Sequence, residues 1–503
     1  MDGTVVSKTL RGLKWSYAAT AFNAILQIGF TAILSRLLEP ASFGLVAMAG
    51  VVLRFGSYFA QIGFGSALVQ KKELSNEEIH SAFIASLVLG GIVTLLTWFL
   101  APFAVRVFHN DNIVAIIKIM SLTFILNGVS ITAISVLRRQ MNFRALAIVE
   151  VTSYFFGYGV IGVSMAYQGY GVWSLVAASL GQVVFTAVGS YSFIKHGIRL
   201  VKVWRNVKEL FAYGSKTSVV GVLEAVAANI DSVLIGHLGG AAPLGIYNRA
   251  FMLVNLPVYY ITSSTTKVLF PSFSQLRTSP DLLQRAYVSA ILVASGLVFP
   301  ICIGIMAASD EIIHVILGGR WASAVPVVQV LAIATPSAML VQFSGIICDA
   351  KARFRIKVWI QVFHIGLLVV LFYSLRDFGV VGFAAALGIG EIVRQLAYAV
   401  IVGNLLSISY REHLDIYAPP VLSGLVVGCT VWGTSSLLSS IGMVQWGILL
   451  IDVIMGLFAW LVFFFWGPQK LLRREVLLRL AQIVPAQIQN KVLNRFVDVL
   501  RRA

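Results

Sequence analysis

The chain has 503 residues, of which 58% are hydrophobic and 12% are charged, and its mean hydropathy is +0.87. A water-soluble fold cannot bury that much apolar surface, so the composition excludes a protein built from soluble domains. The net charge of +17 would suit nucleic-acid binding, and the positions of the charges decide against that class.

Apolar segments follow one another along the chain, each long enough for the roughly 20 residues that a helix needs to cross a bilayer. The first begins near Trp15 and lacks a small-residue cleavage site, so we expect a retained helix and not a signal peptide. The pattern predicts an all-α polytopic membrane protein with about 14 transmembrane helices. The expected spans are 15–38, 44–68, 80–105, 113–137, 147–167, 172–193, 216–240, 247–271, 286–309, 327–350, 355–375, 380–406, 417–438 and 444–466.

Lysine and arginine collect in alternate connections between these segments. Short loops rich in Lys and Arg stay in the cytoplasm, so we expect both termini to be cytoplasmic. Topology and attraction to anionic lipid headgroups then explain the net charge, and no nucleic-acid partner is expected. The basic connections include Lys14, Lys71, Arg138, Arg205, Arg285, Arg355 and Arg411.

The segment SRLLEPASFGLVAMA (35–49) aligns with GHLGGAAPLGIYNRA (236–250). Each copy follows a long apolar helix, makes a short turn and starts the next helix at a Gly-aliphatic pair. Spans one and two therefore correspond to spans seven and eight in the same orientation. Parallel repeats of this kind are typical of secondary transporters that rock two bundles around a central site.

The repeat predicts two six-helix lobes with two additional C-terminal helices. We expect an N-lobe at 1–194, a basic cytoplasmic linker at 195–215, a C-lobe at 216–406, helices 13 and 14 at 407–466, and a tail at 467–503. Basic residues alternate with apolar ones in the tail, which favours an amphipathic helix on the cytoplasmic membrane surface over a partner-docking segment.

Charged side chains within the spans are candidate functional residues because burying them in a membrane is costly. Arg54, near the middle of span two, either binds an anionic headgroup in a central cavity or pairs with a carboxylate of a neighbouring helix. Arg249 could gate or line the mouth of the cavity, although a residue in such a turn more often braces the loop. Lys267 is a further candidate for substrate binding, and snorkelling explains it about as well. Arg394 is three residues from Glu391, so a local ion pair competes with a substrate-binding role.

Acidic residues in the spans are candidates for coupling transport to protons or sodium. Glu224 and Asp231 are seven residues apart in span seven and share a helix face, and Glu391 lies in span twelve. Pairing with the basic residues above is the competing role. Asp452, in span fourteen, lies outside the repeat and is expected to be structural or to serve oligomerisation. The three cysteines and seven histidines form no metal-binding pattern, so neither a metal nor a cofactor is expected.

Several stretches also resemble the Wzx-type polysaccharide flippases of bacteria, which belong to the polysaccharide transport family of the multidrug/oligosaccharidyl-lipid/polysaccharide superfamily. The colanic-acid-exporter-like branch is the most similar. One position departs from the pattern, since relatives often carry an acidic residue where this chain has Gln61, which puts any ion-coupling role of that position in doubt. The matching stretches are LSRLLEPASFG (34–44), GFGSALVQKK (63–72), RQMNFR (139–144), GYGVWSLV (169–176), DSVLIG (231–236), LGIYNRA (244–250) and GRWASAVP (319–326).

The resemblance implies a V-shaped bundle in the bacterial inner membrane that moves an undecaprenyl-pyrophosphate-linked oligosaccharide from the cytoplasmic to the outer leaflet. It implies a proton or sodium gradient as the driving force, cavity cations for the pyrophosphate, and a polysaccharide polymerase and chain-length proteins as partners. A cation-coupled drug antiporter of the same superfamily is the first alternative, and Arg54 argues against it. A membrane-embedded polymerase or glycosyltransferase is the second, but the short loops carry no acid/base constellation, so we expect no enzyme.

Overall fold

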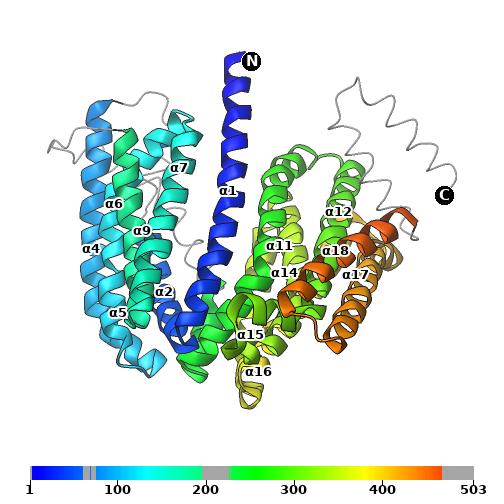
Figure 1. The fold of residues 1–503 in the computed structure, drawn as a ribbon. Helices are drawn as coiled ribbons and strands as arrows, with labels where there is room; N and C mark the ends of the chain where they lie inside the picture. Colours follow the sequence, from blue (N-terminus) through cyan, green and yellow to red (C-terminus); the bar gives the residue numbers. More distant parts are fainter. Residues whose placement is uncertain (1–2, 61–67, 70–74, 195–225, 227, 467–503) are drawn as a thin grey trace. The chain divides into compact units, whose positions relative to one another are not determined.

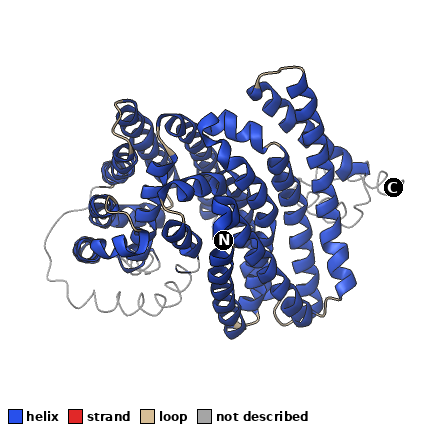
Figure 2. Cartoon of the chain, turned by 90° about the horizontal axis from the view of Figure 1, so that it is seen from below, coloured by secondary structure: helices blue, strands red, loops and turns tan. Residues whose placement is uncertain are grey.

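The computed structural model describes residues 3–60, 68–69, 75–194, 226 and 228–466, and these residues form helices and short connections without a strand (Figures 1 and 2). The chain divides into two compact units. One unit comprises residues 1–248 with 316–320, and the other comprises residues 249–315 with 321–503. The predicted linker at 195–215 and tail at 467–503 lie outside the described residues, so the predicted domain boundaries stay predictions.

The first half of the chain forms a bundle in which α4 packs along α6, α1 along α7, and α9 against α6, α7 and the π-helix η1. Helix α4 starts with a capping box, since Ser75 Oγ accepts from Glu78 N–H at 3.2 Å and Glu78 Oε2 accepts from Ser75 N–H at 3.1 Å. A further helical segment covers 228–238. The helices are α1 (Gly3–Leu37), α2 (Pro40–Ala60), α4 (Asn76–Phe108), α5 (Ile113–Met120), α6 (Leu122–Arg139), α7 (Phe143–Tyr154), η1 (Phe155–Gly162), α8 (Val163–Tyr167) and α9 (Val172–Phe193).

The second half packs α12 against α14 and α17, α14 against α16, and α17 against α18. Large side chains such as Phe273, Tyr287 and Phe343 fill the core of this bundle and are 0–2% exposed. The helices are α11 (Ala241–Gln275), α12 (Pro280–Ala307), α13 (Ser309–Ile312), η2 (Ile313–Leu317), η3 (Gly319–Ala324), α14 (Val325–Ala350), α15 (Phe354–Ser374), η4 (Arg376–Phe378), α16 (Gly379–Leu406), α17 (Tyr410–Ser440) and α18 (Gln445–Trp466).

Twelve helical segments of the described chain are long and apolar enough to cross a membrane, and they coincide with twelve of the expected spans. The polytopic all-α fold is therefore confirmed. The other two expected spans, 216–240 and 247–271, contain residues or side chains that are not described, so the count of fourteen stays a prediction. The segments are Lys14–Leu37, Pro40–Tyr58, Asn76–Phe108, Ile113–Arg139, Phe143–Tyr167, Val172–Phe193, Pro280–Ala307, Gly319–Ala350, Phe354–Ser374, Arg376–Leu406, Arg411–Ser440 and Gln445–Trp466.

The outward faces of these helices are apolar. In Gln445–Trp466 the most apolar stretch has a mean hydropathy of 2.6, yet only 22% of that stretch is buried within the protein. Phe99 is 82% exposed and Trp432 is 67% exposed. Hydrocarbon is the solvent in which such a surface is stable, so the chain is a multi-pass membrane protein.

The two aligned stretches have matching local structures. Helix α1 ends at Leu37 and α2 starts at Pro40. The helical segment 228–238 ends 201 residues after Leu37, and α11 starts at Ala241, which is 201 residues after Pro40. The same break between two helices therefore occurs at the same place in both copies of the repeat.

Candidate functional site

Four of the candidate charges form two groups, one in each compact unit. The first group comprises Arg54 and Asp231, and the second comprises Glu391 and Arg394.

Arg54 lies within the membrane span Pro40–Tyr58, four residues before its last residue. It is 14 residues after the first residue of α2, which places it about 21 Å along the helix axis from Pro40. Its side chain is exposed in the isolated chain. Among the described residues, the charged group that acts on it electrostatically is Asp231. A guanidinium at this depth requires water or an anion, because the five N–H donors have no partners in hydrocarbon.

Asp231 is held by two donors of its own compact unit. Tyr247 Oη–H, from the first turns of α11, donates to Asp231 Oδ2 at 2.7 Å. The backbone N–H of Ser232 donates to Oδ1 at 2.6 Å. Tyr247 is 1% exposed, so its ring is fixed by packing. The carboxyl group thus has a defined position, and it lies within electrostatic range of Arg54.

The second group is an ion pair with a neighbouring imidazole. Arg394 Nη2 donates to both oxygens of Glu391, at 2.8 and 2.6 Å, within α16. His364, on α15 and 3% exposed, places Nε2 3.6 Å from Glu391 Oε1. The next residue along, Gln395, donates from Nε2 to Tyr417 Oη on α17 at 3.2 Å. A polar layer therefore joins three membrane helices.

The local pair that competes with a substrate-binding role for Arg394 is present. The Glu391 and Arg394 side chains are 9% and 16% exposed, so the pair is largely buried. Breaking a buried pair is destabilising because it leaves an uncompensated charge, whereas an intact pair contributes little net stability. This geometry suits a structural or gating contact, and a substrate-binding role for Arg394 or an ion-coupling role for Glu391 stays a prediction.

The structure says less about the remaining candidates. Arg249 is half-buried in α11, with Nη1 3.8 Å from Met252 Sδ. Lys267 is in the helical part of α11, but its side chain is not described. Glu224 lies outside the described residues. The predicted roles of these three residues stay predictions.

Two residues of these groups were missed in the sequence. Tyr247 lies inside the stretch LGIYNRA (244–250), but nothing in the sequence shows that it reaches Asp231. His364 is the one ionisable residue in the apolar run from Val358 to Phe372, which is a signal that could have been used. Within the described chain, no group of three or more His, Cys, Asp or Glu residues is placed to hold a metal ion.

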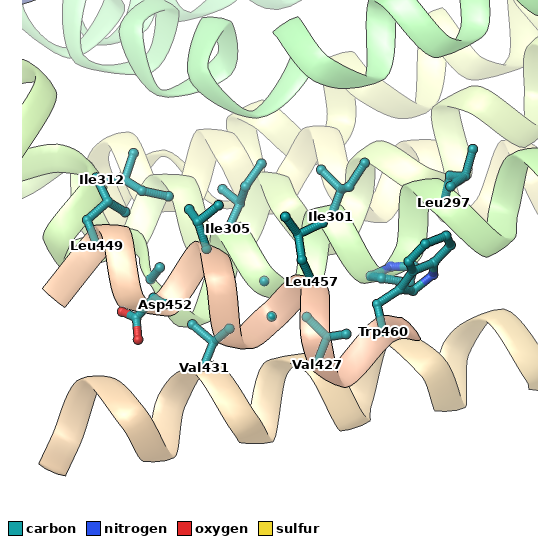
Figure 3. Close-up of a pocket in the computed structure, with 15 residues that line it drawn as sticks. Leu297, Ile301, Ile305, Ile312, Val427, Val431, Leu449, Asp452, Leu457 and Trp460 are labelled. Atoms are coloured by element: carbon teal, nitrogen blue, oxygen red, sulfur yellow. The ribbon is translucent and has the colours of Figure 1, made fainter. Parts of the chain in front are cut away.

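An apolar cavity of about 310 Å³ lies between α12, α17 and α18 (Figure 3). Ile301, Val431, Leu457 and Trp460 are among the residues that line it. Asp452 is the only ionisable residue of this lining. Trp460 also donates from Nε1 to the carbonyl of Gly296 at 3.0 Å, which connects α18 to α12.

Several curated proteins are similar to the chain over most of its length. The succinoglycan biosynthesis transport protein ExoT of Rhizobium meliloti is 26% identical over 442 residues, which cover 86% of this chain and 87% of ExoT. The teichuronic acid biosynthesis protein TuaB of Bacillus subtilis is 25% identical and covers 86% and 90%. The lipopolysaccharide biosynthesis protein WzxC of Escherichia coli is 23% identical and covers 83% and 85%.

Solved structures show the same fold at low identity. The lipid II flippase MurJ in an inward closed conformation has a TM-score of 0.70 at 14% identity, with 90% of this chain and 98% of MurJ covered. An inward-facing multidrug resistance transporter of the MATE family has a TM-score of 0.59 at 15% identity, with 76% and 94% covered.

The family comparison covers the N-terminal half and the start of the C-terminal half. Residues 33–326 match the family described as "Polysaccharide biosynthesis protein". This match spans more than half of the chain and contains all seven of the stretches that carried the resemblance, together with Arg54, Asp231 and Tyr247. The chain therefore belongs to this family of polysaccharide biosynthesis proteins.

Proposed function

We propose that the chain is a flippase that moves an undecaprenyl-pyrophosphate-linked oligosaccharide repeat unit from the cytoplasmic to the outer leaflet, for export of a surface polysaccharide. Membership of the polysaccharide biosynthesis family supports this function. Transport and lipopolysaccharide biosynthesis appear in the names of ExoT and WzxC, and the fold is that of transporters. A transporter, and not an enzyme, is the function that these similarities support.

The observation that carries the proposal is the exposed side chain of Arg54 within a membrane span. A pyrophosphate headgroup is anionic and has several acceptor oxygens, so its transfer across hydrocarbon requires a cation on the path. Arginine fits this role because its planar fork makes paired, charge-assisted hydrogen bonds to phosphate oxygens. In the proposal, Arg249, Lys267 and Arg394 contribute further positive charge to the substrate path.

Asp231 has a second role in the proposal. Its carboxylate interacts with Arg54 when no substrate is present. An incoming pyrophosphate competes for the same guanidinium, and a proton or sodium ion arriving at Asp231 would release Arg54 for that substrate. Asp231, with Glu224 and Glu391, is therefore proposed to couple ion and substrate movement.

The location and partners in the proposal follow the charge pattern and the chemistry of the substrate. We place the chain in the bacterial cytoplasmic membrane with both termini inside, since the basic connections alternate. A polysaccharide polymerase and chain-length proteins would act on the product at the outer leaflet.

Depletion of the protein in its host tests the proposal. Lipid-linked oligosaccharides are extracted and identified by mass spectrometry, and outer-leaflet material is labelled on spheroplasts. We expect complete repeat units to accumulate in the inner leaflet. Re-expression of the wild-type chain restores export, Arg54→Gln fails to restore it at equal protein level, and Arg54→Lys restores it in part. Normal export after depletion would exclude the flippase function.

A drug or cation antiporter is the second candidate, and the MATE-like fold favours it. Such a transporter needs carboxylates that are free to bind a cationic drug, whereas Asp231 interacts with Arg54. Altered drug or cation efflux together with normal oligosaccharide export after depletion would support this candidate.

A further inference from the structure

Two acidic side chains lie buried among α13, α17 and α18. Glu311 is 5% exposed and Asp452 is 1% exposed. The two carboxyl groups act on each other electrostatically. Two ionised carboxylates in apolar surroundings are unfavourable, because both lose their hydration and they repel each other. The pair therefore requires a positive charge.

Neighbouring hydroxyl groups of α17 contact the pair. Ser435 Oγ–H donates to Glu311 Oε1. Thr434 Oγ1 lies 2.6 Å from Asp452 Oδ1. The other two carboxyl oxygens, Glu311 Oε2 and Asp452 Oδ2, are buried and have no hydrogen-bond partner among the described residues. Unpartnered buried oxygens are costly on an ionised carboxylate and much less so on a protonated one.

The contacts of Thr434 favour a proton on Asp452. Besides Asp452 Oδ1, Thr434 Oγ1 lies 2.9 Å from the carbonyl oxygen of Val431. A hydroxyl group has a single hydrogen and cannot donate to both oxygens. A protonated Asp452 resolves this, because its O–H donates to Thr434 Oγ1 while Thr434 donates to the Val431 carbonyl.

Among the described residues, other charged groups do not neutralise the pair. On the same turn as Glu311, His314 Nδ1 is 3.2 Å from Asp310 Oδ1, and these two side chains pair with each other. Asp452 is the only charged residue of α18. In the helices packed around the pair, the charged residues lie at the opposite ends. These residues are Asp281 and Arg285 in α12, Asp349 in α14, and Arg411, Glu412 and Asp415 in α17.

The cavity beside Asp452 provides no hydrogen-bonding group either. Figure 3 shows Asp452 toward the end of the cavity marked by Leu449, and the other lining side chains are apolar except for the Trp460 N–H, which is bonded to Gly296. An apolar cavity tends to stay dry, so water does not compensate an ionised Asp452.

We infer that Glu311 and Asp452 together bind one proton, and that Thr434 and Ser435 position the two carboxyl groups for it. In the proposed topology the loop after α12 faces outward, so the site takes its proton from the outside of the membrane. A role of this proton in coupling rests on the proposed transport function, whereas proton binding itself does not.

Infrared spectroscopy of the purified full-length protein in lipid nanodiscs tests the site without any substrate. Carbonyl bands of protonated carboxyl groups, which shift on exchange into deuterated water, are recorded across the pH range in which the protein stays folded. We expect Asp452→Asn to remove a band equivalent to one carboxyl group near neutral pH. In Glu311→Gln the band should remain, because Asp452 is still buried without a cation, but it should disappear at a lower pH than in the wild type because the like-charge repulsion is gone. The matched control Asp310→Asn, at a side chain that is 58% exposed, leaves that band unchanged.

The outcomes separate the site from the transport function. Loss of the band in Asp452→Asn, together with its shift to lower pH in Glu311→Gln, establishes proton binding even if depletion of the protein leaves oligosaccharide export normal. A wild-type spectrum without this band, one that Asp452→Asn does not change, or a pH dependence that Glu311→Gln does not change overturns the inference. Loss of the wild-type band on adding sodium at constant pH would show that the pair binds sodium instead and overturns the assignment to a proton.

Discussion

Gly44 and Gly245 occupy equivalent positions in the two aligned stretches, and each lies against the backbone of the other's helix start. A β-carbon on Gly44 would be 1.7 Å from the carbonyl oxygen of Ala241, and one on Gly245 would be 1.9 Å from that of Pro40. Pro40 and Ala241 are themselves equivalent in the alignment. The contact is therefore reciprocal, and the two aligned stretches pack against each other through equivalent residues.

Substituting Gly44 is expected to destabilise the protein. In Gly44→Ala the new β-carbon meets backbone rather than a movable side chain, so α2 and α11 must separate. Overpacking of this kind costs about 1–3 kcal/mol. We expect a lower melting temperature and a smaller folded fraction by fluorescence-detected size-exclusion chromatography in detergent. Gly245→Ala should have the same effect, because its β-carbon would meet the backbone of Pro40.

Gly50→Ala is the matched control for this substitution. Gly50 lies in the same helix, and a β-carbon there would have nothing within 4 Å. Alanine also favours the helix over glycine, so Gly50→Ala should be neutral or slightly stabilising. Equal behaviour of the Gly44 and Gly50 variants would show that the close approach does not determine stability.

Arg54 and Asp231 allow charge balance to be separated from substrate binding. Arg54→Gln leaves the Asp231 carboxylate without its cation, so we expect less folded protein. Adding Asp231→Asn restores the balance of charge and should restore the folded yield. Export of the lipid-linked oligosaccharide should stay lost in the double variant, because the proposed pyrophosphate ligand is still missing. Recovery of both yield and export would assign Arg54 a purely structural role.

The buried pair of α16 is expected to show strong non-additivity. Arg394→Gln leaves Glu391 buried with His364 as its nearest basic neighbour, and breaking such a pair typically costs about 3–5 kcal/mol. The double variant Glu391→Gln/Arg394→Gln removes both charges and should be more stable than Arg394→Gln alone. Melting temperatures of the two single variants and the double variant measure this coupling. Additive shifts would mean that the two charges do not stabilise each other.

The positions of the helices were largely readable from hydropathy, because a membrane span is a local property of the chain. The span expected at 172–193 coincides with α9. The first residues of the helices were harder to predict. Helix α17 was expected from 417 but begins at Tyr410, because its first turn is polar and is fixed by the Ser409 and Glu412 capping box. Hydropathy reports the apolar part of a helix and not its capped end.

The residues that contact the candidate charges were harder to predict from the sequence. Arg54 and Asp231 were identifiable because single charges in apolar runs are conspicuous. Tyr247 and Glu311 were not, since the first reads as an ordinary aromatic residue and the second as part of a connection. Tyr247 contacts Asp231 from a different helix, and Glu311 contacts Ser435, which is far away in the sequence. Only the folded chain brings these residues together.

Trp460 is expected to stabilise the position of α18 through its single hydrogen bond. Trp460→Phe keeps an aromatic ring against α12 but removes the N–H that donates to the Gly296 carbonyl at 3.0 Å. The loss of one such bond costs about 0.5–1.5 kcal/mol, and leaving the carbonyl unpaired in hydrocarbon adds to this. We therefore expect a lower melting temperature and faster hydrogen exchange along α18. Trp446→Phe, in the same helix at a side chain that is 66% exposed, should change neither quantity. Matching results for the two variants would show that ring packing alone holds α18 against α12.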